Sequence, residues 1–199
     1  MKELKTEYKA KKQEIRSKLE EFKRDKSPEQ LFEELCFCLC TPMSKAETVI
    51  RAINPSTKNI LLNGTEAELT SLLQKNTRFH ITKAKRIIAA RKNIIDISRL
   101  SADGQKARAF LVENVNGLGM KEASHFLRNI GYKDIAIIDG HILNSMQEFG
   151  IIRGNKRPKN CREYLALEKK FFKFANNIGI ASEELDLLLW SRKTGKIIK

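Results

Sequence analysis

The chain is poor in turn-forming residues and has no long apolar run. Of its 199 residues, only 10 are glycine and 4 are proline, which is too few for the many tight turns of a β-sandwich. No window approaches the roughly 20 apolar residues that a membrane-spanning helix needs. The first 26 residues also lack the apolar centre of a secretion signal. We therefore expect an intracellular, all-α protein with no membrane segment.

Cysteine is scarce as well, and its spacing argues against a metal site. Cys36, Cys38 and Cys40 alternate within an apolar stretch that is predicted to be helical, where side chains two positions apart do not face one another. A chain without an export signal keeps its thiols reduced. The three histidines form no ligand pattern with these cysteines, and a four-cysteine iron–sulfur series is absent. We predict buried structural thiols, no metal and no cofactor.

Acidic residues are outnumbered, since 38 Lys and Arg stand against 24 Asp and Glu and give a formal charge of +14. The segment 75–93 holds seven of these cations and no acid. Ile81, Ala84, Ile87 and Ile88 recur there at helical spacing, which predicts a helix with one buried face and cations on the other. Such charge is typical of nucleic-acid binding. A lysine-rich, solvated surface of the thermophile kind is the alternative.

The remaining pattern predicts helix after helix. Capping boxes begin two of them, at Ser27 with Gln30 and at Thr65 with Glu68. Ile135–Ile138 is the one strand-like stretch, too short to found a sheet, and 150–160 is expected to be a long loop. The other helices are expected at 2–26, 44–53, 104–113, 120–130, 139–149, 160–176 and 182–192.

Two glycines, Gly117 and Gly119, separate two of these helices. They allow a tight hairpin in which Leu118 points into the core and backbone N–H groups face outward. Free N–H groups at the start of a helix can bind a phosphate. The hairpin is therefore either a packing turn or a phosphate clamp, and the positive charge of the chain favours the clamp.

The motif GLGMKEA at 117–123, with Lys121 at its centre, is followed by Asp139 in AIIDGH. This pattern resembles the helix-hairpin-helix DNA glycosylases, which use a lysine nucleophile and a trailing aspartate. With the stretches 123–132, 41–44 and 185–199, it resembles more closely the small archaeal-type 8-oxoguanine DNA glycosylase/AP lyases, the second Ogg class, which has no iron–sulfur cluster. The resemblance covers essentially the whole chain.

This resemblance implies a two-lobed helix-hairpin-helix fold with the active site in the cleft between the lobes. One lobe is expected at 28–135, and the other from 1–27 together with 136–199. The implied function is excision of 8-oxoguanine from duplex DNA by a monomer, through a lysine Schiff base and β-elimination. The implied roles are catalysis by Lys121 and Asp139, phosphate binding by Gly117, Gly119 and His141, base recognition by Lys199, Trp190 and Phe79, and DNA intercalation by Met43.

The chemistry suits the two catalytic residue types. Breaking the N-glycosidic bond builds positive charge at C1′, which a carboxylate stabilises, and an amine that attacks C1′ forms a Schiff base. Lys121 must be neutral to attack, so we expect desolvation and neighbouring cations to lower its pKa. Lys121 could instead contact a phosphate. Asp139 could be a helix N-cap, which is compatible with catalysis because a capped carboxylate stays ionised and fixed.

The other implied roles have structural alternatives. His141, Met43, Trp190 and Phe79 could each be a packed core residue, and the final Lys199 could be an ordinary fraying terminus. Met43 also departs from the glutamine that many relatives carry near this point, which leaves the opposite-base preference open. Two functional alternatives remain: a glycosylase for another lesion, such as oxidised pyrimidines, and a DNA-binding module without catalysis.

Overall fold

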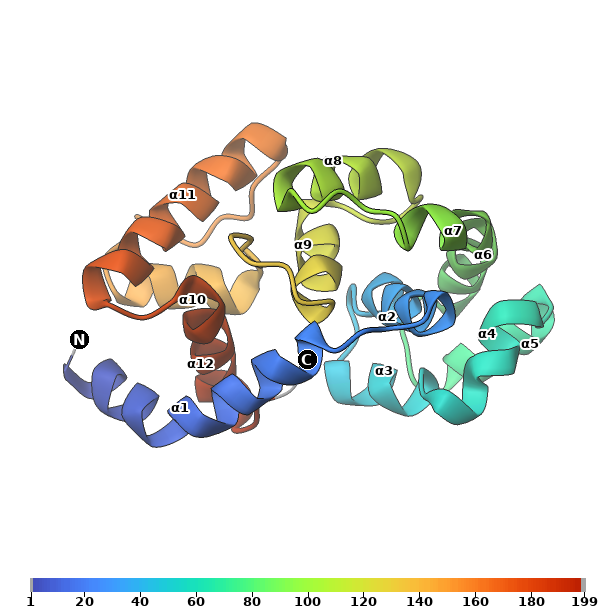
Figure 1. Ribbon diagram of the computed structural model, residues 1–199, viewed down its shortest axis with the longest axis horizontal. Coiled ribbons are helices and arrows are strands. Elements are labelled where there is room, and N and C mark those ends of the chain that lie inside the picture. Colours follow the sequence, from blue (N-terminus) through green and yellow to red (C-terminus); the bar gives the residue numbers. More distant parts are fainter. Residues whose placement is uncertain (1, 198–199) are drawn as a thin grey trace. The chain divides into compact units, whose positions relative to one another are not determined.

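The computed structural model describes residues 2–197, which contain no β-strand. None of the helices in this range combines the length and apolarity that crossing a bilayer requires. The α-helices are α1 (Lys2–Lys23), α2 (Pro28–Cys40), α3 (Ala46–Ala52), α4 (Lys58–Asn63), α5 (Glu66–Gln74), α6 (His80–Ala90), α7 (Ile94–Ile97), α8 (Gly104–Asn114), α9 (Met120–Asn129), α10 (Gly140–Glu148), α11 (Cys161–Ile178) and α12 (Ser182–Thr194); two 3-10 turns, η1 (Pro55–Thr57) and η2 (Arg91–Asn93), precede α4 and α7 (Figure 1).

The chain forms two compact units. One runs from Asp25 to Phe126, and the other combines the chain up to Arg24 with the chain from Leu127 onward. The first unit ends inside α9, whereas the sequence analysis expected the lobe border after residue 135. The lobe borders remain a prediction.

In the unit Asp25–Phe126, α2 is the central helix, and it packs against α3, α4, α6 and α7. The expected capping box begins this helix: the Ser27 side chain accepts from the Gln30 N–H, and the Gln30 side chain accepts from the Ser27 N–H. Cys36, Cys38 and Cys40 are fully buried thiols, as predicted. Burial raises the pKa of Cys40 to about 12, so this thiol stays protonated and packs as a small apolar group.

In the other unit, α12 packs against α1, α10 and α11. Tyr8 and Arg16 of α1 both donate to the carboxylate of Glu184 near the start of α12. Near the other end of α12, Arg192 pairs with Glu7 of α1 at 3.0 Å. These polar contacts flank the apolar residues Leu4, Ile15 and Phe22 that α1 buries.

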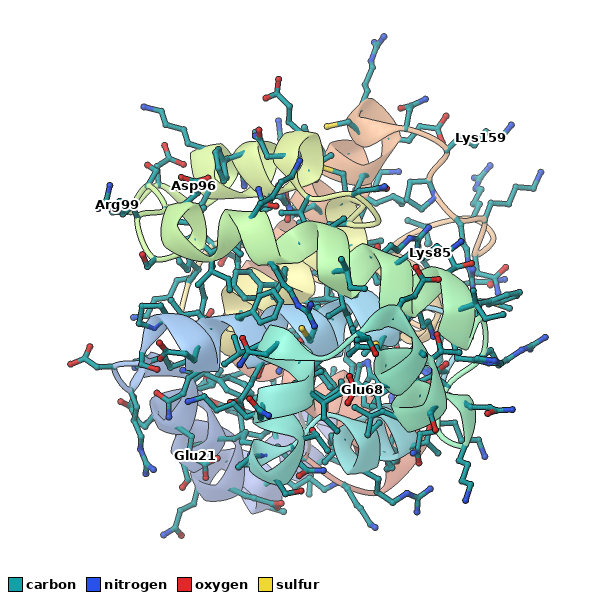
Figure 2. All side chains as sticks on the ribbon, turned by 90° about the vertical axis from the view of Figure 1, so that its right-hand side faces the viewer. Glu21, Glu68, Lys85, Asp96, Arg99 and Lys159 are labelled. Carbon is teal, nitrogen blue, oxygen red and sulfur yellow. The ribbon has the colours of Figure 1, made fainter. Side chains whose placement is uncertain are left out.

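The sequence analysis was wrong about the face that α6 buries. Ala84 and Ile87 are buried as expected, but Ile81 is 53% exposed, while Lys83 is 2% exposed. By contrast, the charged side chains that are labelled in Figure 2, among them Lys85 of α6 and Lys159 of the loop before α11, are exposed. The short helices α4 and α7 were not predicted.

Candidate active site

The chain forms a tight turn between α8 and α9, as expected. Leu118 is buried, and its N–H donates to the Val115 carbonyl at 3.1 Å. Gly117 has φ +97, and a Cβ there would lie 2.4 Å from Cδ of Arg86. Glycine is favoured here, because a side chain would adopt an unfavourable backbone conformation and would force the Arg86 side chain to move. Arg86 thus lies directly against the hairpin.

Lys121 lies in the first turn of α9, with its side chain 30% exposed. Its Nζ is 2.9 Å from Oε1 of Glu122. We expected neighbouring cations around this amine, but its ion-pair partner is an acid. The other carboxylate oxygen of Glu122 lies 3.3 Å from the position that a Cβ of Gly119 would take. The sequence analysis missed Glu122, although an acid three residues after the N-cap position of a helix is a recognised capping signal.

Asp139 is held by the buried segment Ile135–Ile138 that precedes it. The backbone groups of this segment bond to side chains of α11: Glu168 accepts from the Ala136 N–H at 2.9 Å, and the Tyr164 hydroxyl accepts from the Ile138 N–H at 3.0 Å. The same hydroxyl donates to the Ala136 carbonyl at 2.8 Å. Because these side chains bind the backbone in place of a partner strand, the segment is neither helix nor part of a sheet. It carries Asp139 to the start of α10.

Both carboxylate oxygens of Asp139 accept hydrogen bonds. Oδ1 accepts from the Ile142 N–H at 2.8 Å, which confirms the predicted N-cap. Oδ2 accepts from the indole N–H of Trp190 at 3.0 Å. Trp190 is half-buried, and its ring meets the ring of His141 edge to face at 5.5 Å. His141 is exposed, so the alternative of a buried core histidine is wrong.

A buried ion pair lies in the same unit as Asp139. Nη2 of Arg128 is 3.7 Å from Oδ2 of Asp186, and both side chains are almost wholly inaccessible. Burial raises the pKa of Asp186 to about 7, with the charge of Asp139 acting in the same direction and Arg128 opposing both. Neither Asp186 oxygen has a hydrogen-bond partner among the described residues. The sequence carried no signal for this pair, since charged residues on α9 and α12 are ordinary surface types.

Met43 and Phe79 are the most exposed large apolar residues of the described chain, at 55% and 59%. The alternative of core packing is therefore wrong for both. Each has a left-handed backbone, with φ of 57 and 58, which bulky residues seldom adopt. The third base-recognition candidate, Lys199, lies outside the described residues.

The structure thus brings Asp139, Trp190 and His141 together in one unit. It places Lys121, the hairpin glycines, Met43 and Phe79 in the other. Among residues 2–197, no group of three or more His, Cys, Asp or Glu side chains could hold a metal ion.

Comparison with known proteins identifies the family. Residues 15–180 match the family described as 8-oxoguanine DNA glycosylase. The chain is 39% identical to the 8-oxoguanine DNA glycosylase/AP lyase of Korarchaeum cryptofilum over 188 residues, which are 93% of this chain and 90% of that protein.

Solved structures of 8-oxoguanine DNA glycosylases superpose on this chain over its whole length. The 8-oxoguanine DNA glycosylase of Thermotoga maritima superposes with a TM-score of 0.91 at 35% identity, covering 100% of this chain and 97% of that one. The Methanocaldococcus jannaschii 8-oxoguanine glycosylase/lyase, solved in complex with 15mer DNA containing 8-oxoguanine, superposes with a TM-score of 0.89 at 37% identity and covers both chains fully. With its hairpin, lysine and capped aspartate in place, this chain belongs to the 8-oxoguanine DNA glycosylase family.

Proposed function

We propose that this protein excises 8-oxoguanine from duplex DNA and then cleaves the strand at the resulting site. The observation that carries the proposal is the Asp139 carboxylate, fixed by two donors in a chain that also presents Lys121 just after a glycine hairpin. The full-length similarity to a glycosylase/lyase solved with 8-oxoguanine DNA supports the choice of substrate.

Lys121 is the proposed nucleophile. Its neutral amine attacks C1′ of the damaged nucleotide, and the electrons of the N-glycosidic bond leave with the base, which gains a proton. The C1′–O4′ bond of the sugar then breaks, O4′ takes a proton from the attached nitrogen, and the nitrogen becomes an iminium. The iminium acidifies a C2′ proton, whose removal expels the 3′ phosphate by β-elimination. Water then releases the amine. In the free protein, Glu122 is the partner of this amine at 2.9 Å, so the ammonium proton must leave that pair before attack.

Asp139 is proposed to stabilise the positive charge that develops at C1′. A carboxylate does this best when it is ionised and already oriented, because no reorganisation is then needed during the reaction. The Ile142 N–H and the Trp190 indole N–H each hold one of its oxygens. The N-cap and catalytic roles are therefore compatible.

DNA binding is proposed to involve the hairpin and the exposed residues around it. Gly117, Gly119 and His141 are proposed to contact phosphates, and Arg86 adds a cation directly beside Gly117. Trp190, Phe79 and Lys199 are proposed to bind the flipped base, and Met43 to fill the space it leaves. We expect the protein to act as a monomer inside the cell, in the cytoplasm or at the nucleoid.

Excision assays on matched duplexes test the proposal. The wild-type protein should release 8-oxoguanine and nick the strand without alkali, in preference to acting on thymine glycol or mismatch duplexes. Asp139→Asn should slow excision by roughly 100-fold, the scale seen when one preorganised transition-state contact is lost. Asp103→Asn is the matched control, because Asp103 is also an N-cap, accepting from the Gln105 and Lys106 N–H groups of α8. Equal or better activity on thymine glycol would overturn the substrate, and binding without excision would overturn the activity.

A further inference from the structure

Two strained, exposed apolar residues lie on the same compact unit. Met43 is in the turn between α2 and α3, and Phe79 immediately precedes α6; both have left-handed backbones. Such strain persists only where the surroundings impose it, and it gathers at functional sites. We call these two residues, Met43 and Phe79, the wedge pair.

Lys83 holds the turn that carries Met43. Its Nζ donates to the Cys40 carbonyl at 2.7 Å, to the Pro42 carbonyl at 2.9 Å and to the Ser44 hydroxyl at 2.8 Å. An ammonium group has three donors, so all of them are used on one short segment. The bonded residues flank Met43 on both sides.

Lys83 and Ser44 also connect this turn to Phe79. The Ser44 hydroxyl accepts from the Arg78 N–H at 3.0 Å, and the Phe79 carbonyl accepts from the Lys83 N–H at 3.0 Å. One buried lysine and one hydroxyl therefore join both members of the wedge pair in a single hydrogen-bonded unit.

Burying this ammonium is unfavourable in itself. Lys83 is only 2% exposed. Desolvation, together with the nearby charge of Arg86, lowers the pKa of its ammonium group to about 8. An apolar side chain of similar length would avoid the desolvation cost but could not hold the three acceptors. The ammonium thus contributes geometry that packing alone would not provide.

The surroundings of the wedge pair suit a DNA duplex. Ile81, two residues after Phe79, is also apolar and 53% exposed, and the guanidinium of Arg78 lies 5.7 Å from the centre of the Phe79 ring. Base pairs offer flat apolar faces, while the phosphates beside them attract cations.

We propose that Lys83 is a positioning residue for base flipping: it holds the turn in the strained conformation from which Met43 enters the base stack when the lesion leaves, and it ties this turn to Phe79, which is proposed to bind the flipped base. Lys83 acts through Met43 and Phe79 and touches no reacting atom. This inference rests on the proposed glycosylase function and adds to it the group that holds the intercalating residue Met43 in position.

The test compares 8-oxoguanine in a fully paired duplex with 8-oxoguanine in an unpaired bubble, where flipping needs little help. In single-turnover excision, Lys83→Met should lose roughly tenfold on the paired duplex and under about twofold on the bubble. Met43→Ala should show the same selective loss. Because both changes remove one function, the double variant should be no slower than the slower single variant.

Controls separate positioning from folding and from the proposed function. Lys106→Met changes an exposed lysine of the same unit and should leave both rates unchanged. If Lys83→Met does not fold, as judged by circular dichroism, Ser44→Ala removes the shared hydroxyl and should give a smaller selective loss. Equal losses on both substrates, or multiplying effects in the double variant, would overturn the inference. Failure of the wild-type protein to excise 8-oxoguanine would instead overturn the proposed function.

Discussion

The hydrogen bond from Trp190 to Asp139 leads to a specific prediction about catalysis. Trp190→Phe removes the N–H that binds Oδ2 at 3.0 Å but keeps an aromatic ring at this position, while the Ile142 N–H still holds Oδ1. A hydrogen bond to a charged acceptor contributes about 1.5–3 kcal/mol, and about 1.4 kcal/mol corresponds to tenfold in rate. Because Trp190 is half-buried, we take the lower end and expect excision to slow about tenfold.

Single-turnover excision of 8-oxoguanine measures this effect, and a second background identifies its origin. If Trp190 acts through Asp139, Trp190→Phe should cost under about twofold in a protein that already carries Asp139→Asn. A loss of the same size in both backgrounds would refute this reasoning and would assign Trp190 to base stacking alone. His141→Gln is a useful companion, since it removes the ring that meets Trp190 at 5.5 Å while sparing the hydrogen bond.

Three further predictions concern the hairpin, the buried ion pair and the chain end. Gly117→Ala should lower the free energy of unfolding in urea by about 2 kcal/mol, because it adds a left-handed alanine and forces the flexible Arg86 side chain to move. The pKa of Asp186 is about 7 in the folded state, against an ordinary value of 3.8. Between pH 3.8 and about pH 7, the folded state therefore binds more protons than the unfolded state. Stability should therefore fall as pH rises from about 4 to 7, by at most about 4 kcal/mol, relative to Asp186→Asn. Removal of Lys199 should reduce the preference for 8-oxoguanine over guanine in the excision assay.

Each of these has an outcome that would contradict it. Gly154 has φ +77, and a Cβ added there would meet nothing within 4 Å, so Gly154→Ala measures the backbone cost alone. An equal loss of stability at both glycines would show that contact with Arg86 adds nothing to the cost at Gly117. A stability difference between wild type and Asp186→Asn that does not change with pH would show that Asp186 is not neutralised by burial. Unchanged selectivity after loss of Lys199 would dismiss the chain end from base recognition.

Local signals in the sequence predicted much of the helical framework. The capping boxes at Ser27 and Thr65 form as expected, because their partners lie three residues away. The hairpin with buried Leu118 and the N-cap at Asp139 were likewise predictable. The short helix α4 was missed, since six residues carry little periodic signal.

Contacts between distant residues were not predictable. The segment Ile135–Ile138 is buried without being helix or strand because Glu168 and Tyr164, far along the chain, bind its backbone. Lys83 is buried, although a lysine in a basic segment is normally exposed, because the loop after α2 offers it three acceptors. Tertiary packing decided both features, so helical periodicity misassigned the exposed Ile81 and the buried Lys83.

The central claim is that Lys121 forms a Schiff base with the damaged nucleotide. Borohydride reduction during the reaction with an 8-oxoguanine duplex, followed by peptide mapping, tests it most directly. We expect a covalent protein–DNA adduct on the peptide that contains Lys121, absent from Lys121→Gln and retained by Lys106→Met. Binding of the duplex without any adduct, or an adduct that survives Lys121→Gln, would contradict it.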